Sequence, residues 1–139
     1  MLCAAPSYLA SRGVPETIEQ LGSHNCLVFR SRALRQGWRM REGQEPWLRA
    51  EGRSRLKMDS GEALRDAAVA GLGISLLPGF LVEADLAEGR LVQLLPDYET
   101  ETVRILAIYP SKRYLPAKVR RFIDLLVQAR PVRSDSRGD

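Results

Sequence analysis

The segment that decides the fold is residues 57–95, KMDSGEALRDAAVAGLGISLLPGFLVEADLAEGRLVQLL. It predicts a strand, a helix, a glycine turn, a buried strand, a second helix and a third strand. Asp59 is placed to cap the first helix, and Glu62, three residues later, completes a box-like pair with it. The residues that share one face of this helix by spacing are Leu64, Ala67, Ala68 and Gly71.

In the second half of the segment, residues that break helices and strands alternate with short apolar runs. The glycines of residues 71–73 end the first helix, and Pro78 closes the buried strand at residues 74–77. A second helix is predicted from Gly79 to Ala87, followed by a strand at residues 91–95. A unit of this kind presents a helix N-terminus and a strand end to a crevice, where small anions bind in open α/β sheets.

The flanking regions extend this α/β pattern. Strands are predicted at residues 2–5, 25–29 and 103–109, and short helices at residues 6–13 and 15–22. Residues 30–55 predict two strands around Trp38 and Trp47 that belong to an antiparallel meander, and residues 96–101 a polar turn. From Pro116 a helix is predicted whose apolar stripe comprises Val119, Phe122, Ile123, Leu126 and Val127.

The bulk composition describes one domain, or two very small lobes. The chain has 139 residues, 45% of them hydrophobic, and a net charge of +4. Cys3 and Cys26 lack a metal-binding spacing and are expected to be reduced thiols. No apolar run reaches the roughly 20 residues of a membrane span, and the first residues do not resemble a signal peptide. We therefore expect a soluble, cytoplasmic protein.

Four pieces of the chain carry a family resemblance. They are APSYLASRG (5–13), PETIEQLGSHNCLVFR (15–30), DSGEALRDAAVAGLGISLLPGFLVEADLAEGRLVQLLPD (59–97) and YPSKRYLPAKVRRFIDLL (109–126). In this order and at these separations they resemble the C-terminal part of the effector-binding domain of LysR-type transcriptional regulators. The resemblance covers nearly everything from residue 2 to about residue 128.

The resemblance implies an α/β fold similar to a periplasmic binding protein, with two lobes joined by crossover strands. Residues 1–130 would form a partial effector-binding domain: residues 7–96 the complete second lobe, and residues 103–128 one strand and one helix of a truncated first lobe. Residues 131–139 would be a disordered tail. The winged helix-turn-helix that binds DNA in this family is expected to be missing, so DNA would be bound only through that absent domain.

The resemblance also implies where an effector binds. The cleft between lobes would be lined by the start of the central helix, by the end of the buried strand and by the end of the strand at residues 25–29. A small-molecule effector such as a small organic acid suits the free N–H groups of a helix start and an arginine, although Asp59 would repel an anion. The expected effector-binding residues are Asp59, Ser60, Gly61, Leu77, Pro78, Phe29 and Arg30.

Each of these residues also has a purely structural interpretation. Asp59 and Ser60 can serve only as helix caps, Arg30 can be a solvent-exposed strand end, and Cys26 can be a packed small hydrophobic residue. His24 is interpreted as a helix C-terminal residue that interacts with the helix dipole.

Other function classes fit the sequence less well. Eight arginines in residues 30–55 could form a nucleic-acid surface, but interleaved glutamates are typical of the wet face of a sheet. Residues 63–78 leave only four residues between Gly73 and Pro78, too few for a recognition helix. No nucleophile elbow surrounds Ser60, Ser75 or Ser111, so we expect no enzyme. The cysteine spacing and the single histidine favour no metal site, and we expect no cofactor.

The sequence thus predicts the effector-sensing portion of a LysR-type regulator. The predicted last helix and the strand before it would otherwise leave apolar surface uncovered, so we expect either a homo-oligomer through this element or a last helix that folds back against the second lobe. The alternative is an autonomous small-ligand-binding or protein-interaction α/β module without a transcriptional role.

Overall fold

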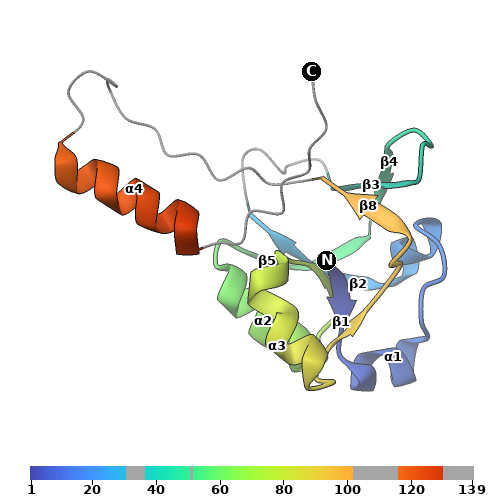
Figure 1. The fold of residues 1–139 in the computed structure, drawn as a ribbon. Helices are drawn as coiled ribbons and strands as arrows, with labels where there is room; N and C mark the ends of the chain where they lie inside the picture. Colours follow the sequence, from blue (N-terminus) through green and yellow to red (C-terminus); the bar gives the residue numbers. More distant parts are fainter. Residues whose placement is uncertain (31–36, 51, 102–115, 130–139) are drawn as a thin grey trace. The chain divides into compact units, whose positions relative to one another are not determined.

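The structure is a computed structural model that describes residues 1–30, 37–50, 52–101 and 116–129. The chain divides into two compact units, residues 1–102 and residues 103–139, which are treated separately below. Figure 1 shows their elements. The predicted strand at residues 103–109 and the predicted tail at residues 131–139 lie outside the described residues.

The first unit is built on a five-stranded sheet with the order β5-β2-β6-β1-β7 (Figure 1). The strand β2 (Asn25–Phe29) lies between β5 (Arg53–Met58) and β6 (Ile74–Leu76) and runs parallel to both. The strand β1 (Leu2–Ala4) is antiparallel to β6, and β7 (Val92–Gln93) is antiparallel to β1. Parallel strands of one sheet require crossover connections. The helix α2 (Gly61–Val69) lies in the crossover that joins β5 to β6, on the other side of β2.

Successive side chains of β1 and β2 pack into different cores, because strand side chains alternate between the two faces of a sheet. Leu2, Ala4 and Cys26 join a core with α1 (Pro6–Arg12) and η1 (Glu19–Ser23). Cys3 and Leu27 join a second core that includes residues of α2 and α3 (Gly79–Ala87). The sheet is therefore buried on both faces.

A second, three-stranded sheet has the order β4-β3-β8. The predicted hairpin is confirmed: β3 (Trp38–Glu42) and β4 (Leu48–Ala50) pair antiparallel. One expectation was wrong. The supposed turn at residues 96–101 contains β8 (Tyr98–Thr100), which pairs with β3. This pairing depends on a partner distant in sequence, which local patterns do not reveal.

The helices of the central segment follow the sequence closely. The predicted buried face of α2 is confirmed at Leu64, Ala67 and Ala68, and α3 has the predicted bounds. Gly71 has a φ of +75°, which favours glycine at this helix end. A Cβ on Gly73 would lie 2.4 Å from the Asn25 carbonyl oxygen, so β6 enters the sheet only with glycine there.

The predicted helix at residues 15–22 forms only the 3-10 helix η1. Pro15 and Gly22 leave too few residues between them for several α-helical hydrogen bonds. Ile18 and Leu21 are nevertheless buried, as their spacing indicated.

The second unit contains α4 (Ala117–Ala129), which confirms the helix predicted from Pro116. Within the part of this unit that is described, the apolar side chains of Val119, Phe122 and Leu125 are 37%, 60% and 64% exposed. Ile123 is half-buried. Val119 and Phe122 belong to the predicted apolar stripe, whereas Leu125 does not.

Candidate functional site

All seven predicted effector-binding residues lie at one edge of the five-stranded sheet. The three parallel strands β5, β2 and β6 are neighbours, so their carboxyl ends point to the same edge. Phe29 and Arg30 end β2, Leu77 and Pro78 follow β6, and the helix start after β5 completes the set. We call this set the ligand edge: Phe29, Arg30, Asp59, Ser60, Gly61, Leu77 and Pro78.

Two members of the ligand edge form an ion pair. Arg30 Nη2 lies 2.9 Å from Asp59 Oδ2, and both side chains are more than 70% exposed. The backbone N–H of Arg30 donates to the Met58 carbonyl oxygen at 2.6 Å, which holds the end of β2 against β5. The Arg30 guanidinium lowers the pKa of Asp59, which keeps that carboxyl ionised. Arg30 therefore offsets the charge that would repel an anion.

Ser60, rather than Asp59, caps α2. The Ser60 Oγ accepts a hydrogen bond from the Ala63 backbone N–H at 3.2 Å and donates one to Glu62 Oε2 at 3.0 Å. The prediction of an Asp59 cap was wrong by one residue, because Asp59 is turned toward Arg30. Hydrogen bonds from its own backbone N–H and from Ser60 lower the pKa of Glu62, so a carboxylate already lies at this helix start.

The remaining members contribute surface and backbone. Phe29 is half-buried against the second core, and Pro78 is exposed. Leu77 is buried, and its backbone N–H donates to the Met1 carbonyl oxygen at 3.0 Å. A Cβ on Gly61 would lie 2.8 Å from Leu81 Cδ1, so the start of α2 lies directly against α3. Because Leu77 is buried, it supports the ligand edge from the core and does not expose its side chain there.

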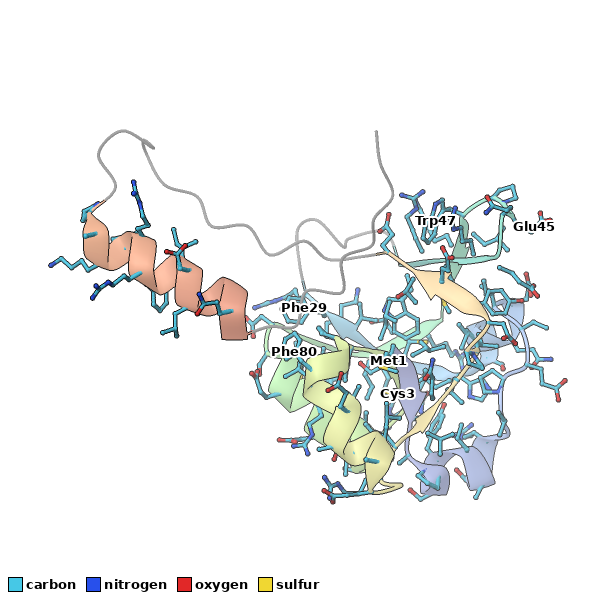
Figure 2. All side chains as sticks on the ribbon, in the orientation of Figure 1. Met1, Cys3, Phe29, Glu45, Trp47 and Phe80 are labelled. Carbon is cyan, nitrogen blue, oxygen red and sulfur yellow. The ribbon has the colours of Figure 1, made fainter. Side chains whose placement is uncertain are left out.

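One residue of this region was missed from the sequence. Phe80 lies in the first turn of α3, two residues after Pro78, and is 59% exposed. Figure 2 labels Phe80 on α3 and Phe29 on β2. The signal available in the sequence was the aromatic Phe80, which closely follows Pro78, the proline that ends the buried strand.

His24 is the C-cap residue of η1, as its interpretation from sequence indicated, but its side chain is buried. It is 6% exposed, and its Nδ1 lies 3.2 Å from the Tyr8 hydroxyl. The Asn25 backbone N–H donates to the same hydroxyl at 2.9 Å, so Tyr8 is free to donate its proton to His24 Nδ1. Burial, with a smaller contribution from Arg12, lowers the pKa of His24. Tyr8 and His24 are 16 positions apart in the sequence, so no local pattern gave a signal for this pair.

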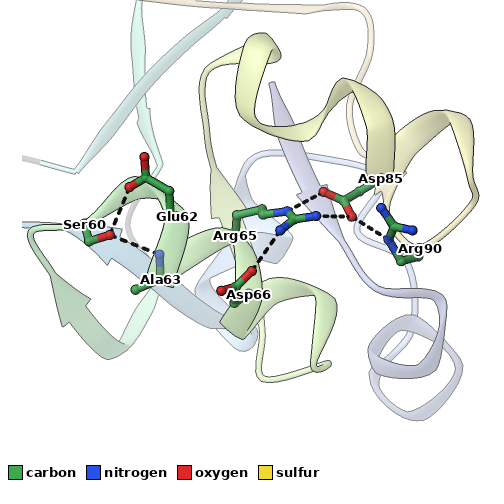
Figure 3. A network of polar contacts seen from close by, with 7 residues as sticks. All are labelled: Ser60, Glu62, Ala63, Arg65, Asp66, Asp85 and Arg90. Carbon is green, nitrogen blue, oxygen red and sulfur yellow. Dashed lines mark hydrogen bonds and ion pairs between the residues drawn. The ribbon is translucent and has the colours of Figure 1, made fainter.

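A buried carboxylate joins α2, α3 and the following turn (Figure 3). Asp85 is fully buried and accepts hydrogen bonds from Arg65 Nε at 2.5 Å, Arg65 Nη2 at 2.8 Å and Arg90 Nε at 2.6 Å. The Arg65 guanidinium lowers the pKa of Asp85. This cluster lies four residues along each helix from the Gly61–Leu81 contact, so two points fix α2 against α3.

Two arginines of the arginine-rich region pair with glutamates of β8 and of the residue that follows it. Arg39 lies 2.6 Å from Glu101, Arg41 lies 2.6 Å from Glu99, and both guanidinium groups lie over the Trp47 ring. Figure 2 shows Trp47 on the β3–β4 hairpin, near Glu45. These contacts agree with the wet face of a sheet and reduce the free positive charge available to nucleic acid.

The cysteines and the metal-ligating residue types form no recognisable centre. Cys3 and Cys26 are buried free thiols, and burial raises the pKa of each to about 11, which disfavours the reactive thiolate. Within the described ranges, no group of three His, Cys, Asp or Glu residues could hold a metal ion. Among the helices in those ranges, none is long and apolar enough to cross a bilayer.

Known proteins similar to this chain belong to one class. Residues 1–131 match the LysR substrate binding domain. The regulator CrgA of Neisseria meningitidis is 35% identical over 127 residues, which is 90% of this chain and 42% of CrgA. The Escherichia coli activator TtdR is 35% identical over 128 residues, 91% of this chain and 40% of TtdR.

Solved structures give the same answer. The full-length Vibrio cholerae virulence activator AphB, a LysR-type regulator, matches with a TM-score of 0.74 and 30% identity over 93% of this chain and 44% of AphB. The CrgA regulatory domain matches with a TM-score of 0.71 and 30% identity over 92% of this chain and 62% of that domain. The chain spans about 40% of the length of the curated relatives.

The α/β fold is therefore the periplasmic-binding-protein-like fold of LysR regulatory domains. The relatives named here are transcriptional regulators rather than enzymes. The chain belongs to the LysR substrate-binding domain family.

Proposed function

We propose that this chain is the effector-sensing portion of a LysR-type transcriptional regulator and that the ligand edge binds the effector. The observation that supports this most is the convergence of seven residues at the carboxyl ends of three adjacent parallel strands. Open α/β sheets bind ligands in the crevice outside these strand ends. In the intact regulator, effector binding would shift the balance between arrangements of the assembly and so alter DNA contact.

The chemistry of the ligand edge favours a small polar effector, and we propose a small organic acid. Arg30 supplies a guanidinium that can bind a carboxylate in a bidentate manner, and its Asp59 partner is too exposed to hold it rigidly. The start of α2 adds a positive dipole end. Phe29 and Phe80 offer aromatic surface for the apolar part of such a ligand.

Several further assignments belong to the same proposal. Residues 7–96 would form one lobe, and the second unit would belong to the other lobe, with residues 103–128 as its strand and helix. The regulator would be a homo-oligomer of the cytoplasm, would bind DNA through a separate winged helix-turn-helix, and would catalyse no reaction. The exposed apolar stripe of α4 supports a requirement for cover by another lobe or copy.

Ligand titration of this chain and of its full-length regulator tests the proposal. A panel of small carboxylic and aromatic acids would be screened by thermal shift, and each hit would be mapped by amide chemical shifts. We expect shifts at residues 29–30, 59–62 and 77–80. Arg30→Gln should weaken binding of an acid by about tenfold or more, the value of one charge-assisted contact.

The matched control is Arg53→Gln, an exposed arginine at the opposite, amino end of β5. It removes the same charge from the same sheet, far along the strand from the ligand edge. Equal weakening by both variants would reduce the effect to net charge and contradict the assignment. Hits that perturb only other regions would also contradict it.

A further inference from the structure

A shallow groove lies beside β7, at the side of the five-stranded sheet opposite to β5. It has a volume of about 340 Å³ and lies between the end of α1 and the segment from β7 to β8. We call it the β7 groove. The residues that form its apolar surface are Leu9, Val14, Pro15, Val92, Leu95 and Tyr98.

The β7 groove is separate from the ligand edge. The ligand edge follows β5, β2 and β6, whereas β7 is the outermost strand, beyond β1. Among the described residues β7 pairs only with β1, so its outer edge is open. Open edges of this kind accept an added extended strand.

The rim of the groove exposes large apolar side chains. Val14 is 59% exposed and Val92 is 41% exposed, although both contact the same depression. Leu95, in its wall, has a φ of +48°, a left-handed conformation that strains a residue with a side chain. Such strain persists where the surrounding structure enforces it, often at binding surfaces.

The charge around the groove is negative. Its two charged lining residues, Glu16 and Asp97, are both acidic. Burial raises the pKa of Tyr98, and the nearby carboxylates of Glu42, Glu19 and Asp97 raise it further. This region contrasts with the chain as a whole, which carries a net charge of +4. The groove therefore selects against anionic partners and attracts cationic ones.

We propose that the β7 groove binds an extended peptide segment of a partner protein in which apolar side chains alternate with lysine or arginine. The segment adds to the outer edge of β7 through its backbone. Its apolar side chains cover Val14 and Val92, and its cationic side chains face Glu16 and Asp97. This adds a protein-interaction surface to the proposed effector-binding function and does not depend on it.

The test uses the full 139-residue chain, labelled with ¹⁵N, and three capped hexapeptides. The first is Arg-Val-Arg-Leu-Arg-Val, the second replaces each arginine by glutamate, and the third replaces each apolar residue by serine. We expect the first peptide to perturb the amides of Val14, Val92, Gln93 and Tyr98. The other two should bind at least tenfold more weakly.

Matched variants separate the groove from general surface effects. The double variant Glu16→Gln and Asp97→Asn should weaken the arginine peptide at least fivefold, whereas Glu45→Gln, an exposed acid on the β3–β4 turn, should not. Val14→Ser should weaken it, whereas Leu72→Ser, another exposed apolar residue, should not. The amide spectrum of each variant reports whether it is folded.

Three results would overturn the proposal. The first is equal binding of the arginine and glutamate peptides. The second is perturbation confined to residues outside the groove. The third is perturbation of the groove amides by raising the protein concentration without peptide, which would assign the surface to a second copy of this chain.

Discussion

Arg65 and Asp85 join the two helices of the central segment through two hydrogen bonds, from Arg65 Nε at 2.5 Å and from Nη2 at 2.8 Å. Asp85 is fully buried, while the Arg65 side chain is 33% exposed. Arg90 adds a third hydrogen bond to the same carboxylate. Because Gly61 lies at one end of α2 and Arg65 one turn further, this contact fixes the direction in which the helix start faces the ligand edge.

Asp85→Asn should lower the free energy of unfolding by about 2–3 kcal/mol. This loss is smaller than the one caused by breaking a fully buried ion pair, because both arginines reach solvent. Chemical denaturation at pH 7 measures this change. The control is Asp66→Asn, which removes the other partner of Arg65. The Asp66 side chain is 70% exposed, so its loss should change stability by less than about 0.5 kcal/mol. Equal effects of both variants would contradict the central role of Asp85.

The cap of α2 can be identified by two alanine variants. Ser60→Ala should lower the free energy of unfolding by about 1 kcal/mol, because the Ala63 N–H loses its acceptor. Asp59→Ala removes an exposed ion pair with Arg30 and should change stability by less than about 0.5 kcal/mol. Urea denaturation measures both losses. A larger loss for Asp59→Ala than for Ser60→Ala would show that Asp59 caps the helix.

Stability should fall with acidification through His24. Burial lowers its folded-state pKa below the ordinary value of 6.5, so the unfolded chain binds the proton more readily. The loss should begin as the pH falls below about 6.5 and end once it passes below the folded-state pKa. Urea denaturation between pH 8 and pH 5.5 would measure it. Above pH 5.5 the carboxylates contribute little to the pH dependence of stability, because they remain ionised.

His24→Asn is the matched control, since the chain has no other histidine and asparagine offers an acceptor where Nδ1 lies. Burial also lowers the pKa of the Met1 amino group, so the variant should retain the loss of stability that begins below about pH 8 and lack the additional loss that begins below about pH 6.5. A variant whose pH dependence equals that of the natural chain would assign the effect to other groups.

Two glycine variants test how tightly the central segment is packed. Gly73→Ala should destabilise by about 1–3 kcal/mol, because the added Cβ would lie 2.4 Å from a backbone oxygen that cannot move aside. At Gly61 the nearest atom is the end of the flexible Leu81 side chain, at 2.8 Å. Gly61→Ala should therefore cost less. Thermal unfolding of both variants gives the comparison, and a larger loss at Gly61 would contradict the packing described here.

The apolar stripe of α4 should make the isolated chain self-associate. Burial of a large apolar side chain contributes about 1.5–3 kcal/mol, and Phe122 and Leu125 are more than half exposed. Light scattering should show oligomers that Phe122→Glu reduces. Lys118→Glu, on the same helix, should leave them unchanged. A monomeric natural chain with unprotected α4 amides in hydrogen exchange would contradict this expectation.

Local patterns predicted most elements because their causes are local. Gly79 to Ala87, bounded by Pro78 and Gly89, gave a helix with the expected limits. The apolar spacing of α2 and the helix from Pro116 were also confirmed. The element that was missed is β8, because it pairs with β3, a strand more than fifty residues earlier in the chain.

The ligand edge illustrates the same division. Its seven residues came from family resemblance, whereas the strand order places them at one edge. Neither the Arg30–Asp59 pair nor the Tyr8–His24 pair had a signal in the sequence, since hydrogen-bond partners 29 and 16 residues apart are set by folding. The roles of these residues in effector binding remain a prediction.

The sequence by itself determined the helices, the glycine and proline boundaries, the apolar faces and the family. These depend on backbone sterics and on periodicities that extend over a few residues. The tertiary structure alone decided that β2 lies between β5 and β6, that Asp85 is neutralised by two arginines, and that β7 has an open edge beside an acidic groove. Such relationships arise when distant segments pack to bury apolar surface, and sequence separation does not encode them.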